Sequence, residues 1–182
     1  MKNALMKKSD FLKKTRQHKM TGKYIVIFIY MLIGISIQIF MLFFFGNWAN
    51  LDIIMYLGFI SLGISAILFL SSNVLKKEGG MEKGRGFVTT KLVETGIYRV
   101  IRHPIYLSLA YVFVGFALIS QHPLSLFFGS TMAILCYYFM IDEEKLTIEK
   151  FGENYVQYMK NVPRSNLLIG MWRALRRKEK LK

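Results

Sequence analysis

Four uncharged apolar runs alternate with polar segments along the chain. Residues 24–46 and 53–75 each give about 23 residues, which is enough for a helix to cross the hydrocarbon core of a bilayer. Residues 105–120 and 124–141 are shorter, but only residues 121–123 separate them, so together they predict a helical hairpin. The pattern therefore predicts an all-α integral membrane protein with four transmembrane helices.

The positive charges predict how these helices are oriented. Residues 1–23, 76–103 and 142–182 hold all 25 Lys and Arg residues, whereas the connections at residues 47–52 and 121–123 hold none. By the positive-inside rule, the three basic segments and both termini face the cytoplasm, and we expect a multi-pass protein of a bacterial or archaeal plasma membrane. The formal net charge of +14 also favours contact with anionic membrane lipids. Nucleic-acid binding is not favoured, because the charge flanks apolar runs instead of forming a basic domain.

Small and polar residues inside the first two runs indicate helix packing more than chemistry. Gly34, Gly58 and Gly63 are typical of positions where membrane helices cross. Gln38 lies at mid-membrane depth, where an amide requires a hydrogen-bond partner.

Candidate chemistry begins where the third run starts. Pro104 suits the first turn of a helix, which places His103 at the N-cap and Tyr106 in the first turn. The amides at such a helix start favour an anionic group.

A group of acidic residues follows the fourth apolar run. Glu143 and Glu144 follow Asp142 there, at the negative end of their helix, where carboxylates need compensation. At 1.5 Å per residue the hairpin arms are about 24 and 27 Å long, so both outer ends return to one level. We therefore expect Arg102 and His103 to lie beside these carboxylates. The pairing is either a structural tie or a binding site for a ligand with an anionic end, a cationic end and hydroxyl groups, such as S-adenosyl-L-methionine.

Two motifs resemble a known enzyme family. The first is G-x-Y-x-x-x-R-H-P-x-Y at residues 96–106, and the second joins Glu143-Glu144 to Phe151-Gly152, Tyr155, Tyr158 and Val162-Pro163-Arg164. Together they resemble the isoprenylcysteine carboxyl methyltransferases and the related membrane phospholipid methyltransferases. The resemblance covers residues 90–164, and it implies an S-adenosylmethionine-dependent methyltransferase whose membrane core has four helices here and five in some relatives.

The resemblance also implies site residues. Expected cofactor contacts are Thr90, Lys91, Leu92, Val93, Tyr98, His103, Pro104, Ile105, Tyr106 and Glu143. Glu144 and Arg102 are the catalytic candidates, and Arg164 also matches a motif position. His103 or Glu144 would serve as the base for an amine acceptor, whereas a carboxylate or thiolate acceptor needs none.

The methyl acceptor stays open at this point. Phe139 stands where the eukaryotic prenylcysteine enzymes have an Arg implicated in holding the substrate carboxylate. The main interpretation is an isoprenylcysteine carboxyl O-methyltransferase-like enzyme acting on a lipophilic acceptor. The alternatives are a phospholipid N-methyltransferase, a thiol S-methyltransferase, and a non-catalytic lipid-binding or interaction protein with the same fold.

The chain then divides into four parts. A basic cytoplasmic tail at residues 1–23 precedes two transmembrane helices at residues 24–75, and residues 76–164 form the methyltransferase core with a cytoplasmic cofactor loop. Residues 165–182 are a basic amphipathic tail apt to lie on anionic lipid. Tyr155 and Tyr158 share one helix face, either as interfacial belt residues or as ligand contacts.

Overall fold

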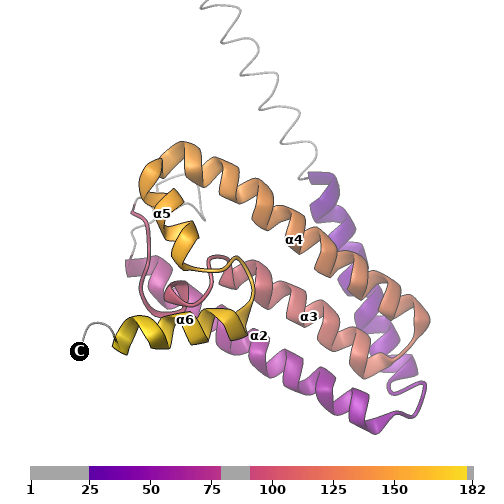
Figure 1. The fold of residues 1–182 in the computed structure, drawn as a ribbon. Coiled ribbons are helices and arrows are strands. Elements are labelled where there is room, and N and C mark those ends of the chain that lie inside the picture. Colours follow the sequence, from indigo (N-terminus) through magenta and orange to yellow (C-terminus); the bar gives the residue numbers. More distant parts are fainter. Residues whose placement is uncertain (1–24, 79–90, 180–182) are drawn as a thin grey trace, which may run out of the picture.

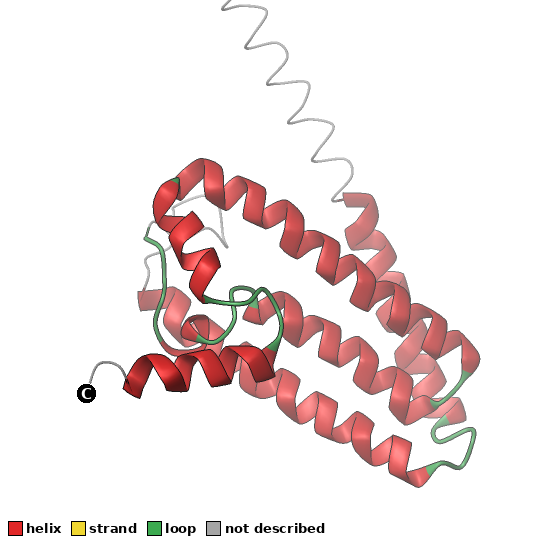
Figure 2. Cartoon of the chain, viewed as in Figure 1, coloured by secondary structure: helices red, strands yellow, loops and turns green. Residues whose placement is uncertain are grey.

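A computed structural model of the chain describes residues 25–78 and 91–179. These residues form helices joined by loops, with no strand among them (Figure 2). The helices long and apolar enough to cross a membrane are Ile25–Phe45, α2 (Asp52–Glu78) and α4 (Pro123–Phe151). A shorter apolar helix, α3 (Pro104–Ser120), completes the predicted set of four, so the all-α membrane fold is confirmed. Thr90, the Gly-rich loop before it and the basic tail at residues 1–23 lie outside the described residues.

Helix α3 packs between α2 and α4 (Figure 1). The helix Ile25–Phe45 joins this layer from the α4 side, where Tyr30 meets Phe128 with ring centroids 6.0 Å apart. A buried cluster of Phe113, Met132 and Cys136 fills the space between these helices. The outer faces expose many large apolar side chains, as expected for helices whose solvent is lipid.

Gln38 shows how a polar group joins three of these helices. Its side chain is fully buried, and its Nε2 donates to the backbone oxygens of Phe113, at 3.0 Å, and Ser125, at 3.2 Å. The expectation that this amide requires partners is confirmed for its nitrogen, whose partners are backbone groups of α3 and α4, whereas its Oε1 is buried without a partner among the described residues.

The connections at the end of the bundle remote from His103 are tied to one another. The amides of Asn47 and Trp48 donate to the backbone oxygens of Ile119, at 3.0 Å, and Ser120, at 3.1 Å. The Gln121 side chain accepts from the amide of Leu51 at 3.2 Å and donates to its oxygen at 2.9 Å. Because α3 ends at Ser120 and α4 begins at Pro123, the predicted hairpin is confirmed.

Helix α4 is longer than its apolar run. It continues to Phe151, so Glu143 and Glu144 lie inside the helix and not at its negative end. Their negative charges are therefore not opposed by the dipole at a helix end, and they are balanced by cationic groups from other parts of the fold. Gly152, with φ 58, then turns the chain into α5 (Glu153–Asn161), and α6 (Leu167–Glu179) follows. A short 3₁₀ helix, η1 (Gly96–Arg99), precedes α3.

Only some of the predicted helix-crossing glycines lie at a crossing. A Cβ on Gly58 would stand 2.8 Å from the Gly115 oxygen and 3.0 Å from the Ile119 nitrogen, so α2 and α3 approach here backbone to backbone. A Cβ on Gly34 would meet the flexible end of Met132. A Cβ on Gly63 would meet nothing within 4 Å, so the prediction of a crossing there is wrong.

We expect Gly58→Ala to lower the free energy of unfolding in detergent by about 1–3 kcal/mol, because the added methyl group forces α2 away from α3. Gly63→Ala is the matched control, and it should be neutral or stabilising by up to about 1 kcal/mol through helix propensity. Thermal unfolding followed by circular dichroism measures both. Equal stability of the two variants would contradict the crossing.

Candidate functional site

The imidazole of His103 lies between two carboxylates of α4. Pro104 begins α3, and His103 at the N-cap makes no side-chain capping bond, so its ring is available to neighbours. Its Nδ1 is 3.3 Å from Glu143 Oε2, and its Nε2 is 3.2 Å from Glu144 Oε1. The expected approach of the two hairpin ends is confirmed.

These contacts decide the charge of His103. A carboxylate only accepts hydrogen bonds, so a ring with one on each nitrogen must carry both protons. Burial by itself lowers the pKa of His103, but the hydrogen bonds and charges of Glu143 and Glu144 outweigh it and raise the pKa above the ordinary 6.5. The two carboxylates therefore stabilise the imidazolium form of this side chain.

Glu144 is the centre of the cluster. Arg164 binds it in a fork, with Nε donating to Oε1 at 2.9 Å and Nη2 donating to Oε2 at 2.6 Å. Arg102 Nη1 lies 3.1 Å from Oε1, and His103 occupies the remaining side. The Glu144 side chain is 5% exposed and that of Glu143 is 38% exposed. Glu144 is thus saturated by three cationic groups, whereas Glu143 faces outward.

The Val-Pro-Arg segment is placed by backbone pairing. The amide of Arg102 donates to the Pro163 oxygen at 3.1 Å, and that of His103 donates to the Arg164 oxygen at 3.4 Å. These two bonds align the chain after α5 with the chain before α3, and so carry Arg164 to Glu144. The hydrogen bonds to Glu144 raise the pKa of Arg164.

Tyr137 is a member of the site that the motifs did not indicate. Its hydroxyl accepts from Arg164 Nη1 at 3.0 Å, and the guanidinium lies 5.4 Å from its ring centroid. The one available signal was spacing, because Tyr137 precedes Glu144 by two helical turns and so shares its face of α4.

Buried donors without partners surround the cluster. Tyr98 Oη and Arg102 Nε and Nη1 are buried and have no hydrogen-bond partner in the part of the chain that the structure describes. The Arg102 side chain is only 8% exposed, and its approach to Glu144 is an ion pair without hydrogen-bond geometry. Burial and the charge of Glu143 raise the pKa of Tyr98, so its hydroxyl stays a donor. Because orphaned buried donors are costly, these atoms suit a ligand that brings acceptor oxygens.

An aromatic wall lies next to His103. Tyr106 stacks on Phe139 with ring centroids 6.1 Å apart and an interplanar angle of 20°, and its ring is 6.0 Å from that of His103. Phe139 therefore packs against the predicted cofactor contact Tyr106, and it offers no charge to an acceptor.

The two tyrosines of α5 are internal. Tyr155 and Tyr158 are buried and pack with Val162 and Leu92, which rules out an interfacial belt. The Tyr158 hydroxyl donates to the backbone oxygen of Tyr98 at 2.6 Å and so ties α5 to η1. Burial raises the pKa of both phenols.

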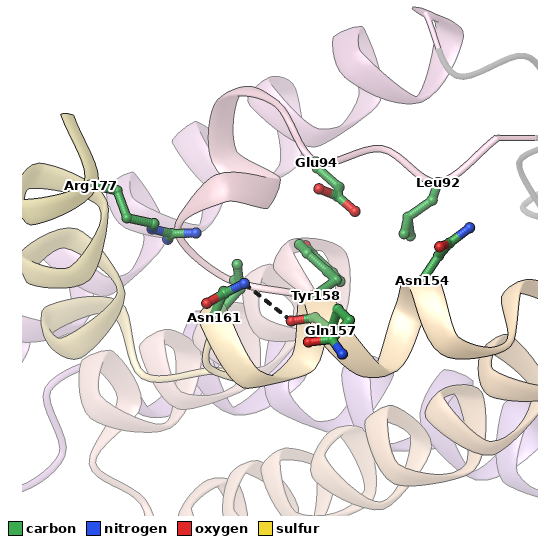
Figure 3. A pocket seen from close by; sticks show the side chains of 8 residues that line it. Leu92, Glu94, Asn154, Gln157, Tyr158, Asn161 and Arg177 are labelled. Atoms are coloured by element: carbon green, nitrogen blue, oxygen red, sulfur yellow. Dashed lines mark hydrogen bonds between the residues drawn. The ribbon is translucent and has the colours of Figure 1, made fainter. Parts of the chain in front are cut away.

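A cavity of about 360 Å³ adjoins Tyr158 on its other side (Figure 3). It lies between the segment before η1, α5 and α6, and its lining residues are Leu92, Glu94, Asn154, Gln157, Tyr158, Asn161, Val162 and Arg177. Of the predicted cofactor contacts, Leu92 lines this cavity, whereas Lys91 is exposed and Val93 is half-buried. The structure thus gathers Arg102, His103, Glu143 and Glu144 into one cluster and places Leu92 at a neighbouring hollow.

Comparisons with known proteins agree with the motifs. The family model described as phospholipid methyltransferase matches residues 37–154, which is more than half of the chain. The match starts well before residue 90, so it includes the end of the helix Ile25–Phe45 and the whole of α2. A protein-S-isoprenylcysteine O-methyltransferase of Xenopus laevis is 33% identical over 111 residues, which cover 55% of this chain and 38% of that protein. The chain therefore spans well under half the length of this relative.

We expect Glu144→Gln to lower the free energy of unfolding by about 3–5 kcal/mol, because it leaves buried cations without their counter-charge. The matched control is Glu143→Gln, which should lower the free energy of unfolding by about 1 kcal/mol or less. The Glu143 carboxylate is partly solvated, and His103 retains its ion pair with Glu144 in this variant. Chemical denaturation in detergent measures the difference. Similar losses in both variants would show that Glu144 is not the centre of the cluster.

Proposed function

The chain belongs to the phospholipid methyltransferase family, and we propose that it is an integral-membrane methyltransferase that uses S-adenosylmethionine to methylate a lipophilic acceptor. The observation that carries this proposal is the cluster at one end of the helical hairpin, in which motif residues surround Glu144. Beside it, Tyr98 and Arg102 have buried donors without a partner among the described residues. By the distribution of Lys and Arg, this end and both termini face the cytoplasm, from which the cofactor enters.

The residues present fit the cofactor. The Tyr98 hydroxyl would donate to its carboxylate, and the partly exposed Glu143 would accept from its amine or its ribose hydroxyls. The cavity beside Leu92, with Glu94 and the carboxamide of Asn154, would hold the nucleoside part. When bound, S-adenosylmethionine supplies a methyl group that its sulfonium already activates. The protein's work is then alignment of the acceptor and exclusion of water.

The state of the cluster favours an acceptor that needs no base. The two carboxylates favour the protonated form of His103, and three cationic groups surround Glu144, so both groups are poor bases. A carboxylate acceptor is already an anion at neutral pH, whereas an amine or a thiol must first lose a proton. We therefore place carboxyl O-methylation first, as in an isoprenylcysteine carboxyl O-methyltransferase. Phospholipid N-methylation and thiol S-methylation follow.

In this proposal Arg102 holds the carboxylate of the acceptor, the role of the Arg that eukaryotic prenylcysteine enzymes have at the position of Phe139. The Arg164 guanidinium is occupied by Glu144 and Tyr137, whereas Arg102 Nε and Nη1 donate to no acceptor in the part of the chain that the structure describes. We therefore assign Arg102 to the acceptor carboxylate, with the stacked Tyr106 and Phe139 against the lipophilic part. Glu144 is a positioning residue that holds Arg102 and His103.

Tyr98→Phe tests the cofactor assignment. The buried hydroxyl makes no hydrogen bond among the described residues, so its loss should leave stability unchanged or raise it. It should weaken S-adenosylmethionine binding about fivefold, the equivalent of one hydrogen bond of about 1 kcal/mol. Calorimetry on the purified protein measures this. The control is Tyr158→Phe, which breaks a bond to the Tyr98 oxygen and should lower stability; unaltered cofactor binding by Tyr98→Phe would defeat the assignment.

A panel of acceptors tests the reaction. Purified protein in lipid nanodiscs receives methyl-labelled S-adenosylmethionine with a prenylated cysteine bearing a free carboxylate, with its amide, with phosphatidylethanolamine, or with a long-chain thiol. We expect label only in the free carboxylate, as an alkali-labile ester, and Arg102→Lys should raise the KM of that acceptor about tenfold or more. Label in phosphatidylethanolamine or in the thiol would overturn carboxyl methylation. Cofactor binding without transfer to any of these acceptors, or to a whole-lipid extract, would support the non-catalytic alternative.

A further inference from the structure

Helix α6 carries an exposed apolar stripe that none of the site chemistry uses. Leu168, Met171, Trp172 and Leu175 follow the spacing of one helix face, and their exposed fractions run from 46% to 77%. The helix has 13 residues, so it is far too short to cross a bilayer. A short helix with one apolar face is suited to lie in a membrane surface.

The charge around the stripe is predominantly positive, with Glu179 at the end of the helix as its one acidic residue. Arg173, Arg176 and Arg177 lie on the same helix, and residues 164–178 contain no Asp or Glu. The Arg176 guanidinium lies 4.1 Å from the Trp172 ring centroid, so a cation and an interfacial aromatic side chain stand together at the margin of the stripe. This pairing of an indole with a cation is typical of side chains at the level of lipid headgroups.

The fold holds α6 rigidly on η1. Gly170 packs so closely on the Val100 oxygen that a Cβ there would collide with it, and Arg177 Nη2 donates to the Arg99 oxygen at 2.8 Å. The Asn166 side chain accepts from the Ile169 amide at 3.0 Å and so caps the start of the helix. Figure 1 places α6 beside η1, at the opposite end of the bundle from the tip of the α3–α4 hairpin. The stripe therefore has a set orientation and is not the face of a loose tail.

An apolar groove opens beside the stripe. It has a volume of about 410 Å³ and is lined by Gly96, Arg99, Val100, Met171, Ala174 and Leu175. Met171 and Leu175 belong both to the groove and to the stripe, so the two make one continuous apolar surface next to Arg99.

We propose that this surface of α6 and η1 docks on anionic phospholipid, with acyl chains against the stripe and groove and phosphates against Arg173 and Arg176. Charge complementarity selects this occupant, because the surface is apolar and cationic and the protein is already embedded in a bilayer. Docking holds η1, and with it Tyr98, at the level of the headgroups. The proposal does not depend on methyl transfer.

Trp172 reports directly on docking. The chain has two tryptophans, so Trp48→Phe leaves Trp172 as the sole tryptophan of the full-length protein, which is excited selectively over the tyrosines. This protein is placed in nanodiscs of phosphatidylcholine with or without phosphatidylglycerol, and both lipids carry bromine on their acyl chains as a quencher. We expect phosphatidylglycerol to increase the quenching of Trp172, and high salt to reverse the increase.

Charge variants separate docking from simple proximity to lipid. Each basic residue near an anionic surface contributes about fivefold to partitioning, so Arg173→Gln with Arg176→Gln should weaken docking about twenty-fivefold and abolish the effect of phosphatidylglycerol. The matched control is Arg173→Lys with Arg176→Lys, which keeps both charges and should keep the effect. Arg177 is left intact because it ties α6 to η1. Circular dichroism confirms that each variant is folded.

Three results would overturn the proposal. Quenching that is equal in both lipid mixtures would exclude recognition of anionic lipid. Quenching that survives Arg173→Gln with Arg176→Gln would exclude these arginines as the phosphate contacts. Absence of quenching in every mixture would mean that another part of the chain or a second protein covers the stripe.

Discussion

The ion cluster around Glu144 is the constraint on which the rest of the structure depends. A carboxylate this deeply buried is stable only when several donors compensate it, and here Arg102, His103 and Arg164 do so from two separate segments of the chain. Those segments, before α3 and after α5, are in turn held together by backbone pairing of residues 102–103 with 163–164. One charge thus ties the start of α3, the C-terminal part of α4 and the segment between α5 and α6 into a single unit.

The same pairing limits the chemistry that this end of the bundle can support. Cations that neutralise Glu144 deprive it of basicity, and the two carboxylates that hold His103 favour its protonated form. What remains available is binding: the buried donors of Tyr98 and Arg102 and the outward carboxylate of Glu143. A site of this kind suits a reaction in which the cofactor brings an already activated group. The protein then aligns the reactants and excludes water, and proton transfer is of less importance.

Helix packing in the membrane makes this arrangement possible. Apolar burial gives little preference for helix contacts over lipid, so the bundle relies on close backbone approach and on buried hydrogen bonds. Gly58 against Gly115 provides the first, and Gln38 and the Ser65 hydroxyl, which donates to the Ser108 oxygen at 2.8 Å, provide the second. With the remote connections also tied through Gln121, the hairpin arms are fixed in length and register. The two charged ends therefore meet at one level.

The sequence by itself determined the helical membrane fold, the hairpin and the meeting of His103 with Glu143 and Glu144, because uncharged runs, Pro104 and arm lengths are local properties that a helix converts directly into position. It did not determine that α4 continues past its apolar run, that Tyr155 and Tyr158 are internal, or that Tyr137 joins Arg164. Those features depend on contacts between α4, α5 and the Val-Pro-Arg segment. Such contacts join residues distant in sequence around the buried Glu144 carboxylate, so only tertiary packing decides them.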